Sequence, residues 1–245
     1  MIAVESKRKK IENILKQYPD ATMHDLTSHA EDEYVKFSPF YPHGGIPVPF
    51  SSGVTAMSVE SIWQGLKDFE NYGIDTSVFR NDTMKNLKRT TRKYGRVIGH
   101  RAGIHGTTHL GYIDARKQIY LPSYLWVLEN KLSSLVARLK EESASHTVVL
   151  LDYETNSDIE DGRSPLSHAS LVKAYIEGTY PGRKSREPVA IPQIDLVTGD
   201  IVRHEKFGNG TVNEVNQENG RVVVDFENFG VKTLAYAKAR LEKIS

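Results

Sequence analysis

Three polar residues, Glu60, Gln64 and Lys67, are spaced so that a helix would bring their side chains to one face. With about 100° of rotation per residue, they would lie within about 60° of one another. A carboxylate and an amine placed in this way could act as a general acid–base and a nucleophile. The alternative is a polar stripe that faces solvent.

The segment that must position these residues is predicted to be a helix beginning after Ser58, a residue type that is favoured at N-caps. The apolar residues of its opposite face follow at intervals of three and four: Val59, Ile62, Trp63, Leu66 and Phe69. Residues 37–53, just before it, are rich in proline and glycine, which predicts an ordered loop. This loop could fold over the polar stripe, and Trp63 at the border would be costly to leave in water. Both features favour a site over a solvated face.

The residues around this helix resemble the NADAR family, which pairs an F-S-x-F-Y-type loop with an S-x-E-H-x-x-Q-x-x-K helix. The loop resemblance is carried by Phe37-Ser38-Pro39-Phe40-Tyr41-Pro42. The helix resemblance is carried by Ser58-Val59-Glu60 and Trp63-Gln64-Gly65-Leu66-Lys67-Asp68-Phe69. Ser61 stands where the family usually has histidine.

Two later segments are also similar to NADAR motifs. Arg92-Lys93-Tyr94-Gly95-Arg96 resembles the A-x-x-L-G-R turn of the family without its alanine. Residues 153–159 are similar to the acidic loop of the family, but the tryptophan and glycine expected after the aspartate are missing.

The resemblance implies an N-glycosidase that needs no cofactor. Its substrate would be ADP-ribosylated guanine in nucleic acid or a ribosylaminopyrimidine phosphate. Glu60 would stabilise the oxocarbenium-like charge or activate water, and Lys67 could instead form a Schiff base at C1′, which is the preferred route. The catalytic residues implied are Glu60, Lys67 and Asp158. The substrate-binding residues implied are Phe40, Tyr41, Trp63, Gln64, Lys93, Arg96, His100, Arg101 and Tyr153.

A run of basic residues follows the predicted site, and only one acid, Asp82, lies among them: Arg80, Lys85, Lys88, Arg89, Arg92, Lys93, Arg96 and Arg101. Residues 82–94 are predicted to form a helix that ends at Gly95, with Met84, Leu87 and Tyr94 turned inward. The run is either the solvated face of this helix or a groove for a phosphate chain.

No metal site is predicted, although one acidic segment leaves the question open. Asp152, Glu154, Asp158, Glu160 and Asp161 could hold magnesium or form a plain acidic loop. Asp152 ends a predicted buried strand, where sites commonly lie. His105 and His109 flank a Gly-Thr-Thr loop, and the chain has no cysteine, so a zinc site is not expected.

The last 45 or so residues show the pattern of short strands and tight turns that is typical of a small β-barrel. Asn-Gly turns separate four short apolar strands, at residues 201–204, 211–215, 222–226 and 231–234. The segments Gly199-Asp200-Ile201-Val202, Lys206-Phe207-Gly208-Asn209-Gly210 and Leu241-Glu242-Lys243-Ile244 resemble the Tudor-like tail of UvrD/PcrA-type helicases. That resemblance implies an SH3-like adaptor that contacts RNA polymerase, another protein or nucleic acid. Seven Lys/Arg against seven Asp/Glu in residues 199–245 favour a protein partner.

The rest of the chain is predicted to complete an α+β, mainly helical domain of residues 1–178. Helices are expected at residues 6–18, 122–140 and 166–177, and a buried strand at residues 147–151. A linker is expected at residues 179–198 and the barrel at residues 199–245. The net charge of +1 indicates that any attraction to phosphate must come from a local patch. The lack of a signal sequence or an apolar span predicts a cytoplasmic protein without membrane contact.

These observations together predict a hydrolase that cleaves an N-glycosidic bond in a nucleotide-type substrate. The alternative is a non-enzymatic adaptor that binds nucleotide or nucleic acid and recruits a partner through the barrel. The departures at Ser61 and after Asp158 keep this alternative open.

Overall fold

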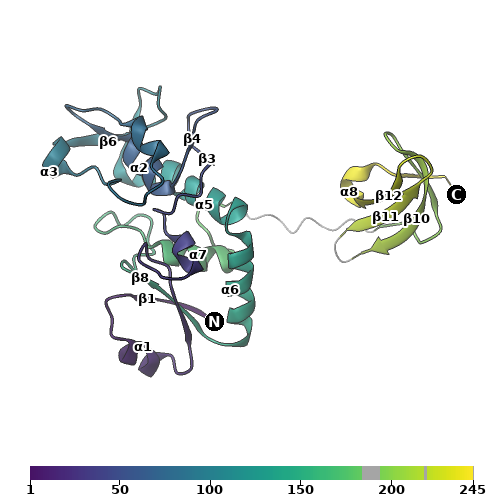
Figure 1. Ribbon diagram of the computed structural model, residues 1–245, viewed down its shortest axis with the longest axis horizontal. Helices are drawn as coiled ribbons and strands as arrows, with labels where there is room; N and C mark the ends of the chain where they lie inside the picture. The colour runs from purple at the N-terminus through teal and green to yellow at the C-terminus, as the bar shows by residue number, and fades with distance from the viewer. Residues whose placement is uncertain (184–193, 218–219, 245) are drawn as a thin grey trace. The chain divides into compact units, whose positions relative to one another are not determined.

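The computed structural model describes residues 1–183, 194–217 and 220–244, which fall into two compact units, Met1–Arg183 and Lys184–Ser245 (Figure 1). The predicted linker is too long at both ends. Tyr180 is buried in the first unit, where its hydroxyl donates to the Leu121 carbonyl, and Leu196 is buried in the second. Residues 184–193 of that predicted linker lie outside the described part of the chain.

The first unit is built on a three-stranded parallel sheet in the order β1 (Ile2–Ser6), β8 (Val148–Asp152), β2 (Thr22–Asp25). The central strand, β8, is buried throughout, as its continuous apolar run predicted. Ile2 and Thr22 both pair with Val148, so the three strands end at one edge, at Ser6, Asp152 and Asp25. The expected helix at residues 6–18 is shorter, α1 (Ile11–Gln17), and β1 precedes it.

Both faces of this sheet are covered, and the strands alternate between them. Ile2, Val148 and Leu150 belong to the main core, where α6 (Ser133–Ser145) and α7 (His168–Ile176) pack. Ala3 and Val149 face the other way and pack against Ile14 of α1. A strand that is buried on both sides needs apolar residues at every position, which explains the unbroken run in β8.

The helix expected after Ser58 is α2 (Val59–Leu66), and a capping box closes its first turn. The Ser58 hydroxyl accepts from the Ser61 N–H at 3.0 Å, and the Ser61 hydroxyl accepts from the Ser58 N–H at 3.1 Å. The residue that departs from the NADAR pattern therefore has a structural role here. The helix stops at Leu66, earlier than expected, because Lys67 opens β5 (Lys67–Phe69).

Strand β5 belongs to an antiparallel sheet with β6 (Val97–Arg101) and β7 (His109–Leu110), and β3 (Ile46–Pro47) pairs with β4 (Thr55–Ala56). Two 3₁₀ turns, Glu33–Phe37 and Thr76–Arg80, complete this region. The predicted helix at residues 82–94 is wrong except for its last turn, α3 (Thr91–Tyr94). Met84 and Asn86 have φ of 58° and 59°, and this left-handed backbone cannot continue a helix.

The predicted helix at residues 122–140 is two helices. α4 (Tyr112–Ala115) runs through a π-helical turn (Arg116–Tyr120) into α5 (Leu121–Asn130), and α6 begins only after a break. The helix predicted at residues 166–177 is α7, followed by Gly178 with φ of 77°. With three sheets among these helices, the first unit is a mixed α+β fold and not mainly helical as expected.

The second unit is a five-stranded antiparallel sheet in the order β12-β11-β10-β9-β13. The strands are β9 (Ile201–His204), β10 (Gly208–Asn216), β11 (Arg221–Phe226), β12 (Gly230–Ala235) and β13 (Glu242–Lys243), with a short helix α8 (Tyr236–Ala239). All four predicted strands are present, and Val202, Val212, Val222, Val224 and Phe226 belong to a separate core. Across the described residues of both units, no helix combines the length and apolarity needed to span a bilayer.

Candidate active site in the first unit

A cavity of about 400 Å³ lies between α2 and the carboxyl-terminal edge of the parallel sheet. Three strand ends contribute lining residues: Arg8 follows β1, Thr27 and Ser28 follow β2, and Asp152 ends β8. In parallel sheets, ligands commonly bind outside the carboxyl ends of the strands. The remaining lining residues come from two loops, from α2 and from the helices around them: Ser38, Pro39, Phe40, Glu60, Trp63, Gln64, Lys88, Tyr112, Arg116, Tyr120, Tyr153, Glu154, Pro165, Leu166 and His168.

Glu60, Gln64 and Lys67 form a hydrogen-bonded series along one side of α2, as their spacing predicted. The Gln64 amide donates to Glu60 Oε1 at 2.8 Å, and Gln64 Oε1 accepts from Lys67 Nζ at 3.0 Å. Gln64 Oε1 also accepts from the Arg89 backbone N–H at 2.9 Å. Two donors on one oxygen fix the amide orientation, so its NH₂ group must face Glu60.

The Glu60 carboxyl is held inside the protein, with the residue only 8% exposed. Its backbone N–H donates to the Pro39 carbonyl at 2.8 Å, which docks the proline-rich loop on the first turn of α2. Burial raises the pKa of Glu60, and the Gln64 hydrogen bond and the charges of Lys67 and Lys88 only partly oppose this. A carboxyl in this state suits proton transfer near neutral pH.

An aromatic wall stands beside Glu60. The Trp63 ring lies 3.8 Å from the His100 ring, and Tyr112 and Tyr120 meet it edge-on at 5.6 and 6.0 Å. Burial, reinforced by the Lys67 charge, lowers the pKa of His100 to about 3, so its imidazole is neutral. His100 packs on the Trp63 ring and is not itself a lining residue of the cavity.

Asp152 and His168 form a buried ion pair on the sheet side of the cavity. His168 Nδ1 lies 3.0 Å from Asp152 Oδ2, and His168 Nε2 lies 2.8 Å from the Leu26 carbonyl oxygen. Both neighbours can only accept, so both ring nitrogens carry protons and the imidazole is cationic. Burial alone would lower the pKa of His168, but the Asp152 charge and these two hydrogen bonds raise it.

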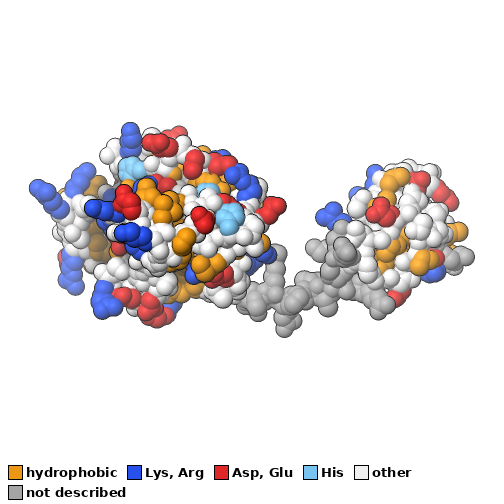
Figure 2. Space-filling view, turned by 90° about the horizontal axis from the view of Figure 1, so that it is seen from below, with side chains coloured by type: hydrophobic (Ala, Val, Ile, Leu, Met, Phe, Trp, Pro, Cys, Tyr) orange, Lys and Arg blue, Asp and Glu red, His pale blue; other side chains and the backbone are white. Residues whose placement is uncertain are grey.

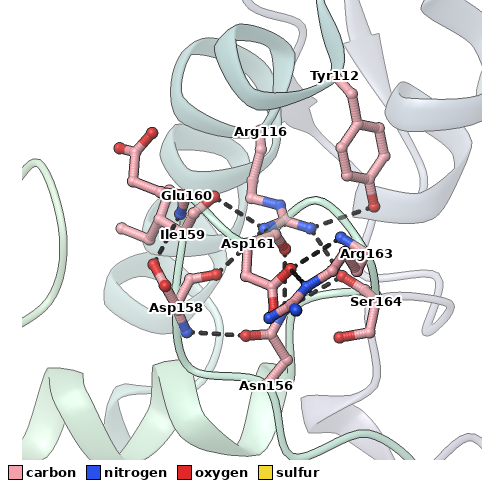
Figure 3. Close-up of polar contacts among 9 residues, drawn as sticks. All are labelled: Tyr112, Arg116, Asn156, Asp158, Ile159, Glu160, Asp161, Arg163 and Ser164. Carbon is pink, nitrogen blue, oxygen red and sulfur yellow. Dashed lines mark hydrogen bonds and ion pairs between the residues drawn. The ribbon is translucent and has the colours of Figure 1, made fainter.

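Arg116 is a buried cation that holds the loop beyond β8 by its backbone (Figure 3). Its guanidinium donates to the carbonyls of Asp158, Ile159, Asp161 and Ser164 at 2.8–3.3 Å, and to the Tyr112 hydroxyl at 3.3 Å. Asn156 Nδ2 donates to two of the same carbonyls, at 3.1 Å each. Carbonyl dipoles thus solvate the guanidinium charge.

A family of unknown function (DUF6939) matches residues 6–172, which is most of the chain and nearly all of the first unit. The chain belongs to this family. Residues 198–243 match the PcrA/UvrD tudor domain, which confirms the predicted Tudor-like barrel. Among curated proteins, none matches the chain. The family has no assigned activity, so the NADAR likeness of the DUF6939 domain stays a prediction.

The DUF6939 domain brings several of the expected site residues to the cavity. Glu60, Trp63, Gln64, Phe40 and Tyr153 line it. Lys67 reaches it only through Gln64 and is not itself a lining residue. Tyr41 packs on His43, with ring centroids 4.8 Å apart, and does not line the cavity either.

Other expected residues lie elsewhere. Asp158 is exposed and outside the cavity lining, because Arg116 and Asn156 hold its loop and its carboxylate accepts from the Glu160 N–H at 2.9 Å. Arg101 is engaged with Asp68 at 2.5 Å. Lys93 and Arg96 are exposed on α3 and the turn after it. The geometry thus supports no direct catalytic role for Asp158, nor substrate contact in the cavity by these three cations.

The acidic loop that could have held magnesium engages protein cations instead. Asp152 pairs with His168, Glu160 with Lys117 at 2.5 Å, and Asp161 with Arg163 at 2.8 Å. Among the described residues, no group of three or more His, Asp or Glu side chains is placed to hold a metal ion.

Sequence reasoning missed four residues that the tertiary structure adds to the cavity: Arg8, Arg116, Tyr112 and Tyr120. Lys88, which also lines it, belongs to the basic run that was weighed as a groove for a phosphate chain. Arg8 was read as part of the helix predicted at residues 6–18, but it lies between β1 and α1. The position of Asp152 at the end of a buried strand was the one local signal for this edge, and His168, read as structural, is its partner.

Proposed function

We propose that the DUF6939 domain hydrolyses an N-glycosidic bond in a nucleotide-type substrate, with Glu60 as the general acid–base. The observation that carries this proposal is the Glu60 carboxyl itself. It is buried in the wall of a ligand-sized cavity, its pKa is raised, and the Gln64 amide orients it.

Glu60 would serve the reaction by moving a proton and by balancing charge. As the C1′–N bond breaks, the sugar acquires oxocarbenium-like character, which a nearby carboxylate stabilises. Water then forms the new C1′–O bond and loses one proton to Glu60, while the leaving base gains one. A carboxyl with a raised pKa holds and releases that proton near neutral pH.

The other cavity residues provide what a nucleotide needs. Trp63 and Tyr112 offer aromatic surface for a base, and Arg8, Lys88 and Arg116 offer positive charge for a phosphate. These three cations and the two aromatic residues line the same cavity as Glu60.

The geometry favours direct water attack over the lysine Schiff base that was preferred from the sequence. Burial lowers the pKa of Lys67, with Arg89 and Lys88 adding to this effect and Glu60 opposing it. However, Lys67 Nζ donates to Gln64 Oε1 and does not line the cavity. We therefore assign Lys67 a positioning role, in which it holds the Gln64 amide toward Glu60.

The test is release of free base from three substrates: ADP-ribosylated guanine in DNA, a ribosylaminopyrimidine phosphate, and a panel of nucleoside monophosphates. Glu60→Gln keeps the shape and the Gln64 contact but removes the proton transfer, so turnover should fall by about 10²- to 10⁴-fold. Glu160→Gln is the matched control, because Glu160 is exposed and outside the cavity. No release from any substrate, or equal turnover in Glu60→Gln, contradicts the proposal.

The tudor match favours a second function for the second unit, that of docking a partner. The unit carries balanced charge and exposes several apolar side chains, among them Phe229 and Val231, so we expect a protein partner before nucleic acid. If the first unit binds nucleotides without turning them over, the chain is an adaptor. Calorimetric titration with the same substrates distinguishes binding from turnover.

A further inference from the structure

The segment that joins the 3₁₀ turn Thr76–Arg80 to β6 carries much more positive charge than the rest of the chain. Residues 80–96, here called the basic segment, hold seven Lys or Arg residues and one acid, Asp82, a net charge of +6. The whole chain has a net charge of +1, so all other residues together carry −5. Six of the seven cations are exposed: Arg80, Lys85, Lys88, Arg92, Lys93 and Arg96.

None of these six exposed cations forms an ion pair with another residue in the described part of the chain. Elsewhere in the first unit such pairs are common: Lys7 meets Asp25, Lys117 meets Glu160, and Arg163 meets Asp161. Figure 2 shows Lys and Arg side chains gathered on the side of the first unit that carries α3 in Figure 1. The positive charge there is therefore available to an external anion.

Leu87 and Arg89 of the basic segment are both buried, and Arg89 anchors the segment at the candidate catalytic helix. The Arg89 guanidinium donates to the carbonyls of Lys67 and Gly73 at 2.7 and 2.8 Å. The Arg89 backbone N–H also donates to Gln64 Oε1. Between these two buried residues, Lys88 turns outward, lines the cavity, and lies 5.6 Å over the Phe40 ring. The basic segment thus runs into the cavity that contains Glu60.

Aromatic side chains lie among these charges. Tyr72 is 62% exposed and meets the Tyr94 ring edge-on at 5.4 Å, while Lys93 lies 5.0 Å over Tyr94. A basic path with stacking platforms is typical of surfaces that bind single-stranded nucleic acid. A duplex fits less well, because its paired bases cannot enter a cavity without leaving the stack.

We propose that the basic segment binds the phosphate backbone of a single-stranded nucleic acid and leads one of its nucleotides past Lys88 into the cavity. This proposal implies that the substrate is a nucleotide within a strand and not a free nucleotide, and that part rests on the proposed function. Binding of the strand does not rest on it, because phosphate contacts need no turnover.

The test measures binding of fluorescein-labelled 20-nucleotide DNA and RNA strands to the full chain by anisotropy between 50 and 200 mM salt. The test variant combines Lys85→Gln, Arg92→Gln, Lys93→Gln and Arg96→Gln. The matched control combines Lys117→Gln, Arg138→Gln, Arg163→Gln and Lys173→Gln, four cations that are ion-paired. Both variants lose the same charge, so a difference between their strand affinities shows that the position of the removed cations matters.

We expect the test variant to bind at least tenfold more weakly than the unaltered chain, and the control to stay within about twofold. The slope of log affinity against log salt should become shallower by about 0.7 for each phosphate contact that is lost. Equal affinities for the two variants overturn the proposal. The proposal is also overturned if polyglutamate of equal charge displaces the labelled strand as readily as unlabelled strand does. The segment would then recognise negative charge alone, as a site for acidic proteins does.

The outcome separates this inference from the proposed function. If strand binding depends on the basic segment but no base is released, the proposed glycosidase activity is contradicted and the proposed binding surface is supported. If base is released from free nucleotides but the two variants bind the strand equally, the glycosidase activity is supported and the binding surface is contradicted.

Discussion

The imidazole of His168 and the carboxylate of Asp152 form an ion pair that is buried where β8 ends and α7 begins, with 3.0 Å between Nδ1 and Oδ2. The carboxylate also accepts from the Ser167 hydroxyl at 2.8 Å and from the Ala169 N–H at 3.3 Å. One aspartate therefore ties the first turn of α7 to the central strand and holds a cation beside the cavity.

We expect His168→Leu to destabilise the first unit by about 3–5 kcal/mol, because it leaves Asp152 buried without a counter-charge. His146→Leu is the matched control, since His146 meets Glu142 at the surface and such pairs contribute about 0–1 kcal/mol. Urea unfolding followed by tryptophan fluorescence reports the first unit alone, because both tryptophans, Trp63 and Trp126, lie in it. Similar losses in the two variants would contradict the ion-pair assignment.

The same pair predicts a pH dependence of stability. The pKa of His168 is raised in the folded state, so its contribution is complete below its ordinary pKa of 6.5 and is lost as the pH rises through the folded value. Burial raises the pKa of Asp152, but His168 and the other hydrogen bonds outweigh this and lower it below 3.8. Stability from the pair should hold between about pH 4 and 6.5 and decline above. The decline should be absent in His168→Leu, and its persistence there would assign it to another group.

Glu60→Gln should stabilise the protein at neutral pH. The folded-state pKa of Glu60 is raised, so ionising it costs stability as the pH rises above its ordinary value of 4.5. Glutamine carries no such charge, and its Tm should exceed that of the unaltered chain by a few degrees at pH 7, given that about 1 kcal/mol corresponds to 2–4 °C at this domain size. The two Tm values should converge below pH 4.5. A Tm difference that is constant with pH would show that ionisation is not its cause.

Gln64→Leu should destabilise the first unit by about 1–3 kcal/mol, because the buried Arg89 N–H loses its acceptor. It also frees Lys67 Nζ and removes the donor to Glu60, so the pKa of Glu60 should rise further. Gln118→Leu, at an exposed position, is the control and should leave stability nearly unchanged. Urea unfolding measures the first effect, and the pH profile of base release measures the second.

Arg116→Lys should loosen the loop that Arg116 holds, although the charge is kept. A lysine ammonium cannot reach four carbonyls with the planar fork of a guanidinium. Because a hydrogen bond to a charged group contributes about 1.5–3 kcal/mol, amide exchange in residues 156–164 should accelerate at least tenfold. Arg163→Lys alters an exposed arginine of the same loop and should not change the exchange. Unchanged protection in Arg116→Lys would show that other contacts hold the loop.

Local sequence patterns were sufficient to predict an element wherever its own residues carry the signals for it. The barrel strands follow from turn residues and alternation, as with Gly220 at φ of 64° before β11. The start of α2 follows from Ser58, and the burial of β8 follows from its apolar run. The shared face of Glu60, Gln64 and Lys67 follows from helical periodicity, although Lys67 lies just past the last turn.

Only the tertiary structure decided what faces Glu60. β1 was not predicted, because a strand of five residues next to a lysine-rich helix carries too little periodicity to be recognised. Residues 82–90 were misread because Leu87 is buried and Arg89 is held by hydrogen bonds to residues far away in the sequence, which override helical propensity. Asp158 was placed in the site by analogy, yet Arg116, some 40 residues earlier in the chain, draws its backbone away. The opposite wall consists of residues at strand ends that are far apart in sequence, Arg8, Thr27 and Asp152, and they meet only because parallel pairing aligns the ends of β1, β2 and β8.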